Sequence, residues 1–232
     1  MSKIVFDIET VGENYEEMDE QTKEIMLKWL KRESYSDEEY QREVDAVKDN
    51  LGFSPLTGQI VAIGVMDVDD GQGAVYYQNP ERRVSDTLLD GIKLQAMSEK
   101  EMLEKFWDIA KRCQECISFN GRAFDVPFLM VRSAIHGLRP TINLMPPRYS
   151  SNATHIDLLD QLTFYGSVRK KGNLHLWCRA FGITSPKADG ISGDDVGKLF
   201  QEKEFLKIAQ YNAGDLKATA ELYRYWNEYM RF

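Results

Sequence analysis

Two acidic side chains, Asp7 and Glu9, stand two residues apart in a short apolar run near the start of the chain. The run IVFDIE has the β-branched and aromatic bias of a strand, and residues i and i+2 of a strand point to the same face. Neighbouring carboxylates in apolar surroundings repel each other and are costly to bury unless a cation lies between them. Oxygen ligands of this kind suit Mg²⁺ or Mn²⁺. The spacing alone also fits two charges at the solvent end of a strand.

Three further residues fall where they could join this pair. After the apolar run CISFNG, Asn120-Gly121 predicts a turn, and a helix is expected to begin near Asp125. An aspartate in the first turn of a helix is favoured by the helix dipole without any function. Late in the chain, Tyr211 and Asp215 are four residues apart in a predicted long helix, hence on one face. Each feature is common when taken alone.

Taken in order along the chain, these features resemble the DEDD exonuclease superfamily. The shared pattern is Asp-x-Glu on the first strand, Asn-x4-Asp at a strand–helix junction and Tyr-x3-Asp on a late helix. The segments FDIET, FDVPFL, THIDLLD, KADGISGDDV and YNAGDL are similar to the exonuclease domain of family B DNA polymerases and to stand-alone predicted exonucleases related to it. The resemblance covers most of the chain from Lys3 to Leu222 and leaves the acidic stretch from about Glu13 to Asn50 as an elaboration. It implies an α/β fold of the ribonuclease H-like type, with a five-stranded mixed sheet and helices on both faces.

The resemblance also implies a role for each acidic residue. Asp7 would ligate both of two divalent cations, Mg²⁺ or Mn²⁺, and Glu9 would ligate the first. Asp125 would support the second cation through water, and Asp215 would close the first site. Tyr211 would hydrogen-bond the attacking water.

Tyr211 is the residue that indicates the branch of the superfamily. A related branch has histidine in this role one residue earlier in the same helix, where this chain has Gln210, so the chain resembles the tyrosine branch. Tyrosine has an ordinary pKa of about 10, so Tyr211 is better suited to orienting the nucleophile than to serving as a general base.

The expected activity is removal of nucleotides from the 3′ ends of single-stranded DNA, in repair or processing. Asn120, Phe124 and Phe128 are predicted to contact the substrate, and an aromatic ring such as Phe53 could stack on a terminal base. Core packing is the ordinary role of at least one of Phe124 and Phe128, because they are four apart on a helix. An exoribonuclease of the same superfamily is the nearest alternative. A non-catalytic nucleic-acid-binding module is disfavoured because the acidic set is complete.

The remaining sequence predicts the elements around these residues. Strands are expected within 58–70 and 73–78, joined by a hairpin at 69–73, and helices at 98–112, 125–137, 174–181 and 203–229. From about Glu13 to Asn50 the chain is polar, but Met18, Ile25, Met26 and Trp29 fall near helical spacing. This stretch predicts a helical insert on the flank of a single exonuclease domain spanning 1–232.

The net charge of −8 resides in the N-terminal part of the chain. Through residue 50 there are 15 acidic and 7 basic residues, a balance of −8, and the other 182 residues carry 22 of each. The insert should therefore repel a phosphate backbone. It is expected to bound the substrate channel and disfavour duplex DNA, or else to dock a protein.

Other polar and sulfur-containing residues are given minor roles. Asp157 and Asp160 are expected to be structural or to face the substrate, and the basic cluster Arg169 to Lys171 either steers phosphate or lies in a solvated loop. The three cysteines form no full disulfide set, so a reducing, cytoplasmic setting is expected. No apolar run is long enough to predict a transmembrane helix.

Overall fold

The computed structural model describes residues 2–28, 36–80, 86–148, 154–184 and 193–231. The first half of the chain supplies most of the strands and the second half most of the helices. In order, the elements are β1 Lys3–Gly12, η1 Tyr15–Glu17, α1 Glu20–Leu27, α3 Asp37–Asp49, η2 Leu51–Phe53, β2 Gly58–Asp67, β3 Gly73–Tyr77, β4 Thr87–Leu89, β5 Ile92–Ala96, α4 Glu99–Ala110, β6 Glu115–Ser118, α5 Asp125–Ile135, β7 His155–Asp157, α6 Leu158–Leu162, α7 Leu174–Phe181, η4 Gly193–Asp195, α8 Val196–Gln201 and α9 Phe205–Tyr229.

The strands form one mixed sheet in the order β4-β5-β3-β2-β1-β6-β7. β1 pairs antiparallel with β2 and parallel with β6, and β6 pairs parallel with β7. The carboxyl ends of β1, β6 and β7 therefore lie at one edge of the sheet. This is the edge at which loops leave the strands toward α5 and α6, and it is where polar side chains can gather.

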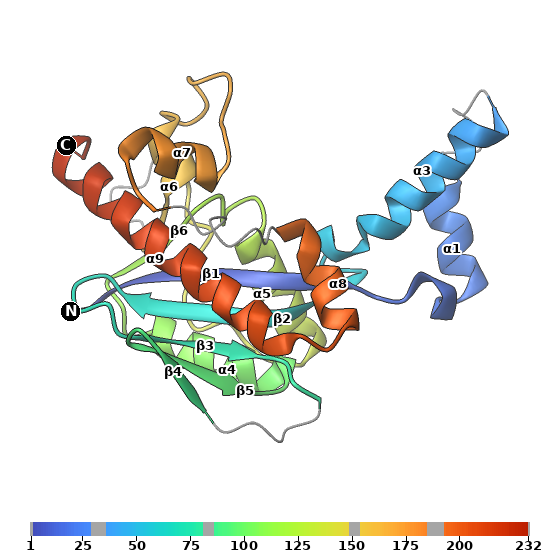
Figure 1. The fold of residues 1–232 in the computed structure, drawn as a ribbon, viewed down its shortest axis with the longest axis horizontal. Helices are drawn as coiled ribbons and strands as arrows, with labels where there is room; N and C mark the ends of the chain where they lie inside the picture. Colours follow the sequence, from blue (N-terminus) through green and yellow to red (C-terminus); the bar gives the residue numbers. More distant parts are fainter. Residues whose placement is uncertain (1, 29–35, 81–85, 149–153, 185–192, 232) are drawn as a thin grey trace.

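Helices cover both faces of the sheet, as Figure 1 shows for α9 on one side and for α4 and α5 on the other. The alternation of side chains along β1 assigns each residue to a face: Val5 and Val11 pack with the α9 side, whereas Ile4, Phe6 and Ile8 pack with the α4 side. Asp7 and Glu9 follow the phase of Val5. They therefore project toward α9.

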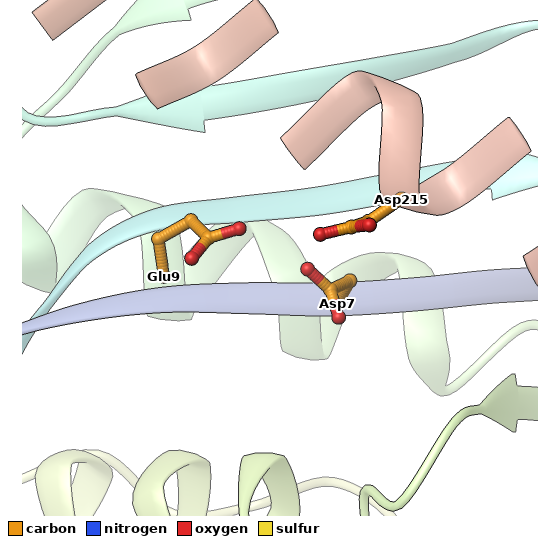
Figure 2. A group of neighbouring side chains, drawn as sticks. All are labelled: Asp7, Glu9 and Asp215. Atoms are coloured by element: carbon orange, nitrogen blue, oxygen red, sulfur yellow. The ribbon is translucent and has the colours of Figure 1, made fainter. Parts of the chain in front are cut away.

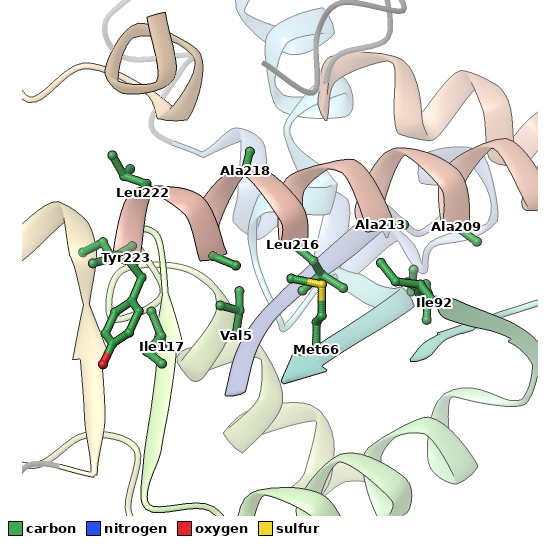
Figure 3. Packing of buried hydrophobic residues seen from close by; sticks show 14 of the residues in the cluster. Val5, Met66, Ile92, Ile117, Ala209, Ala213, Leu216, Ala218, Leu222 and Tyr223 are labelled. Atoms are coloured by element: carbon green, nitrogen blue, oxygen red, sulfur yellow. The ribbon is translucent and has the colours of Figure 1, made fainter. Parts of the chain in front are cut away.

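The long helix α9 is held against the sheet by its apolar stripe. Ala209, Ala213 and Leu216 are buried on the strands, and Figure 3 shows this row facing Met66 and Val5. Small residues at two of the three positions let the helix axis approach the sheet closely. Truncating a buried leucine such as Leu216 to alanine typically destabilises a protein by about 2–5 kcal/mol.

The prediction of an α/β fold with a mixed sheet and helices on both faces is confirmed, but the sheet has seven strands and not five. The additional pair, β4 and β5, turns at Asp90 and Gly91, both with positive φ, and the side chain of Leu88 is 72% exposed. Such short strands lack the clear alternation that a sequence pattern requires. β7 has three residues and runs directly into α6.

Several predicted helices have the expected ends. Ser98 and Glu101 form the predicted capping box at the start of α4. α7 spans the predicted residues and stops at Gly182, whose φ of 71° places it in the left-handed region that favours glycine. In the described ranges, no helix combines the length and the apolarity that crossing a bilayer requires.

The insert between β1 and β2 is helical, as predicted, but it does not pack along the flank of the sheet. α1 and most of α3 project away from the sheet as an arm, which we define as residues 14–50 (Figure 1). α1 has no buried residue, α3 buries Val44, and Ile25 is 61% exposed. The apolar stripe is too narrow to compete with the solvation of so many charges. Trp29 lies outside the described residues.

Candidate metal centre

Three acidic side chains from two distant parts of the chain converge on the α9 face of β1. Asp7 and Glu9 come from β1 and Asp215 from the middle of α9, and one carboxylate oxygen of each lies within 4.8 Å of the other two. Figure 2 shows the three groups pointing toward one another. Glu9 and Asp215 are buried, and Asp7 is partly exposed. The donor set consists of oxygen atoms only, which suits a hard divalent cation.

The electrostatics of the three acids are unfavourable without a cation. Burial raises the pKa of Asp7 well above its ordinary value, and the charges of Asp125, Glu9 and Asp215 raise it further. Burial and the charge of Asp215 also raise the pKa of Glu9, against the effect of a hydrogen bond from Asn212. Each of the three acids opposes the ionisation of the others. A divalent cation between them would offset both the cost of burying their charges and their mutual repulsion.

Asp125 lies beside this group but is not among the three that converge. It begins α5, is 3% exposed, and its Oδ1 accepts a hydrogen bond of 3.1 Å from the backbone N–H of Ile8, between Asp7 and Glu9. Burial raises the pKa of Asp125 to about 7, although backbone hydrogen bonds oppose the shift. Its position beside the three acids is compatible with support of a cation through water.

The turn that positions Asp125 is held by an acidic residue from the neighbouring strand. Asn120 has a φ of 64°, and Asp157 accepts hydrogen bonds of 2.9 Å from the backbone N–H groups of Asn120 and Arg122. Asp157 also caps α6 through the N–H of Leu159, at 3.0 Å. These contacts make Asp157 a structural residue of the turn, in line with the expectation from the sequence.

Asn212 and Gly64 also shape the centre, and neither was predicted from the sequence. Asn212 is fully buried, and its Nδ2 donates to Asp7 Oδ2 at 2.8 Å. Gly64 pairs with Asp7 in the sheet, and a Cβ on it would lie 2.0 Å from Asn212 Oδ1. A glycine in the interior of a strand often marks a place where another backbone or side chain approaches closely. The second sequence signal for this contact is an asparagine in the same helix as a predicted metal ligand.

Tyr211 lies one helical turn before Asp215 and faces the same acids. Burial raises its pKa above the ordinary value, and the charges of Asp215, Glu9 and Asp7 and a hydrogen bond to Asp215 act in the same direction. The phenol therefore keeps its proton at neutral pH. It is suited to orient a water molecule and unsuited to act as a base.

The matches with known proteins agree with this geometry. The model of a family described as "Predicted 3'-5' exonuclease related to the exonuclease domain of PolB" matches residues 52–230. The chain belongs to this family of predicted exonucleases. The matched segment contains Asp125, Tyr211 and Asp215 but begins after β1. The structure brings Asp7 and Glu9, which lie outside the match, to the acidic residues within it.

A solved structure similar to this chain is that of the family B DNA polymerase from the hyperthermophilic archaeon Pyrobaculum calidifontis. The TM-score is 0.57 at 17% identity, and the similarity covers 97% of this chain. The chain spans 24% of the length of that polymerase chain. At this level of identity the similarity concerns the fold. No curated protein matches the chain.

A pocket of about 740 Å³ opens next to the acidic group of this predicted exonuclease. Glu9 lines one end, Phe53 and Phe124 stand together in its wall with ring centroids 6.2 Å apart, and Lys198 of α8 also lines it. Phe53 is 58% exposed, so its ring is accessible to a ligand. Lys48, Asp49 and Asn50 at the end of the arm complete this side of the pocket.

The structure does not support one predicted substrate contact. Phe128 is 1% exposed and packs in the core beneath Phe124, with ring centroids 5.1 Å apart, so it offers no free face to a base. The side chain lies one turn further into α5 than Phe124, on the face that covers the sheet. Phe128 is therefore a core residue that supports the ring of Phe124.

The cysteines take no part in the centre. Cys116 and Cys178 are buried, Cys113 is partly buried, and all three are free thiols. Burial raises the pKa of Cys116 to about 12, which keeps the group as an unreactive thiol at neutral pH.

Proposed function

We propose that this chain is a 3′→5′ exonuclease that hydrolyses single-stranded DNA from its 3′ end with two divalent cations, Mg²⁺ or Mn²⁺. The observation that carries the proposal is the convergence of Asp7, Glu9 and Asp215, with raised pKa values for Asp7 and Glu9, beside Tyr211. Family membership supports the direction of cutting. A cytoplasmic setting and a role in DNA repair stay predictions, as does the organisation of the chain as a single domain.

Each residue of the centre has a separate task in this proposal. Asp7, Glu9 and Asp215 would hold the cations, and Asp125 would act from the second side through water. Two divalent cations in such a site stabilise charge on the attacking and leaving oxygens and lower the pKa of bound water. Asn212 fixes the rotamer of Asp7 through its 2.8 Å hydrogen bond, and Tyr211 orients the attacking water with its phenolic hydroxyl.

The pocket beside Glu9 is suited to the terminal nucleotide. It is larger than the roughly 300 Å³ at which ligand sites begin, and it combines two aromatic rings with polar side chains such as Asn50 and Lys198. Stacking on Phe53 or Phe124 would tolerate any base, because every base has an aromatic face. A frayed or single-stranded end is favoured, because extracting a base from a duplex costs a few kcal/mol.

The test uses a 5′-labelled DNA strand and its RNA counterpart, each incubated with Mg²⁺, Mn²⁺ or EDTA. The proposal expects a ladder of DNA products shortened from the 3′ end, with no products in EDTA. Preferred cutting of RNA would make the chain an exoribonuclease. Binding without hydrolysis under every condition would make it a binding module, and faster cutting of circular than of linear strands would make it an endonuclease.

A further inference from the structure

A second pocket lies away from the metal centre, at the β7 edge of the sheet. It has a volume of about 400 Å³ and is lined by β7, α6, the C-terminal end of α9 and the loops beside them. Figure 1 shows α6 next to this end of α9. None of the four carboxylates assigned to the cations lines it. Its size fits a nucleotide-sized ligand.

The pocket presents aromatic rings on a strained backbone. Phe164 is 56% and Tyr165 36% exposed, and their φ values of 49° and 56° place both in the left-handed region, followed by Gly166 at 98°. Two bulky residues in succession seldom adopt this region. The turn is nevertheless well bonded: the N–H of Tyr165 donates to Asp160 O at 2.7 Å, and the N–H of Val168 donates to Thr163 O at 3.1 Å. Strain of this kind is typical of functional sites.

Charged side chains line the pocket beside these rings. There are three arginines and two aspartates, and Arg231 is paired with Glu115 at 2.6 Å, so these groups are in balance. Asp160 lies 2.9 Å from Arg148 Nε and 3.8 Å from Arg122 Nε, yet its Oδ2 forms no hydrogen bond with the residues described. The side chain of Arg148 is 49% exposed and has donors left for a ligand.

The segment that follows the rings is also basic. Arg169, Lys170 and Lys171 are exposed, and none of them forms an ion pair within the described part of the chain. The carbonyl of Lys171 accepts a 2.7 Å hydrogen bond from Trp177 Nε1, which ties this segment to α7. The exposed aromatic rings and these cations thus stand within eight residues, 164–171, which we name the aromatic-basic loop.

The pocket is connected to the metal centre through the edge of the sheet. Asp157 lines the pocket and also holds the turn that leads to Asp125, and Arg122 reaches the pocket from that same turn. β7 is two strands from β1, and Trp226 at the pocket lies 11 residues beyond Asp215 in α9, roughly 17 Å along the helix axis. A strand of several nucleotides whose 3′ end lies at Glu9 would be long enough to span this distance.

We propose that this pocket and the aromatic-basic loop bind the part of the substrate strand on the 5′ side of the scissile bond. The inference rests on the proposed function, because it concerns the same strand. Rings that stack on bases beside cations that contact phosphates are the usual elements of single-strand binding without sequence preference. The site would increase affinity for longer strands without taking part in hydrolysis.

The experiment measures binding of labelled single strands of about 4 and about 16 nucleotides, in EDTA so that no strand is cut. One variant is Phe164→Ala, and the other combines Arg169→Ala, Lys170→Ala and Lys171→Ala. The matched controls are Leu88→Ala, an exposed apolar residue on β4 at the opposite edge of the sheet, and Lys100→Ala on α4. Thermal melting of every variant confirms folding.

The inference expects Phe164→Ala to weaken binding of the long strand roughly 5- to 100-fold, with a much smaller effect on the short strand. The triple variant should reduce the slope of log affinity against log salt by about 0.7 for each phosphate that the protein no longer neutralises. The controls should resemble the parent. Unchanged length dependence in both variants would overturn the inference, and so would an equal weakening for both strands. If the parent cuts no strand in Mg²⁺ or Mn²⁺, the proposed function fails, whatever the binding shows.

Discussion

At the scale of residues, the centre depends on Asp7, which lies among all the other acids that form it. The amide of Asn212 donates a hydrogen bond to Asp7, and the carboxylates of Glu9 and Asp215 converge with that of Asp7. Asp125 accepts a hydrogen bond from the backbone N–H of the next residue, Ile8. A single residue with this many charged neighbours is the one whose removal should change metal binding most.

We expect Asp7→Ala to abolish both hydrolysis and most of the thermal stabilisation by Mn²⁺. A cation that binds only the folded state stabilises it by mass action, by about 2.7 kcal/mol at a hundred times its Kd. Melting curves of the parent and the variant with Mn²⁺ or EDTA measure this directly. Near-normal nuclease activity in the variant would show that Asp7 is not a ligand of both cations.

For Tyr211, the expected effect is on rate and not on affinity. Tyr211→Phe keeps the ring and removes the hydroxyl that would orient water, so hydrolysis should slow by roughly 10²-fold. Binding of a single strand in EDTA should be unchanged. An equal decrease in binding would make Tyr211 a substrate contact.

At the scale of elements, the spacing between α9 and β2 sets the centre. Gly64 allows Asn212 and Leu216 to lie directly on the sheet, since a Cβ there would be 2.0 Å from Asn212 Oδ1 and 2.7 Å from Leu216 Cδ1. The continuous apolar run of β2 and the apolar stripe of α9 can both be recognised in the sequence. The distance between them is not, because it depends on which residues meet.

Gly64→Ala should therefore affect stability and metal binding together. Overpacking of this kind costs about 1–3 kcal/mol, and displacement of Asn212 would release Asp7. Denaturant unfolding and Mn²⁺ titration of the variant test the two effects. Gly71→Ala, in an open turn where φ is 73°, is the control for metal binding: its backbone strain lowers stability without crowding the centre, so its Mn²⁺ titration should match that of the parent.

The arm is a second element whose effect can be separated. It carries the chain's excess of acid, and it ends at the pocket that Glu9 lines. Replacing residues 15–47 with a short Gly/Ser linker keeps every residue that lines that pocket and should preserve hydrolysis of short single strands. Affinity for duplex DNA should rise, most at low salt, because repulsion of the phosphate backbone is removed. A folded, metal-binding deletion variant with no activity on any strand would show that the arm belongs to the catalytic machinery.

The features that could be predicted from the sequence are those that local rules determine. The pairing of Asp7 with Glu9 follows from the two-residue period of a strand, and the end of α7 follows from Gly182. Features that depend on contacts between distant parts of the chain could not be predicted. Asn212 has the pattern of an ordinary helix residue until β2 is placed beneath it. Phe128 differs from Phe124 only in lying one turn further into α5, where the core covers it. Whether the arm projects or packs on the sheet depends on whether a surface of the body matches the apolar side chains of its helices.

At the scale of the whole molecule, the buried side chain of His155 should make the free energy of unfolding depend on pH. It is 4% exposed, its Nδ1 bonds Leu144 O at 2.8 Å, and its Nε2 bonds Ser118 Oγ at 2.8 Å. Burial lowers its pKa to about 4 from 6.5. As pH falls from 6.5 to 4, the unfolded chain gains a proton that the folded chain does not, so the free energy of unfolding should fall by roughly 3 kcal/mol.

His155→Gln keeps a donor and an acceptor but cannot be charged, so its stability should depend less on pH across this window. Denaturant midpoints of both proteins at about pH 7 and about pH 5, measured in EDTA, give the comparison. The carboxylates of the centre have raised pKa values, so they stabilise the folded state as pH falls. Their contribution is the same in both proteins and cancels when the two pH dependences are subtracted. Parallel curves would show that His155 is not the group responsible.

The root of the arm closes on itself. The N–H of Glu13 donates to Thr57 O at 2.8 Å, Thr10 Oγ1 donates to Gly52 O at 2.7 Å, and Gly12 lies so close to Gly52 that neither has space for a side chain. The backbone thus leaves and re-enters the body at a single point. Doubling the length of such an excursion costs only about 0.6 kcal/mol in loop closure. This junction is therefore a natural grafting point, at which a reporter domain could replace the arm and sense a ligand arriving at Glu9, three residues before Gly12 in the same strand.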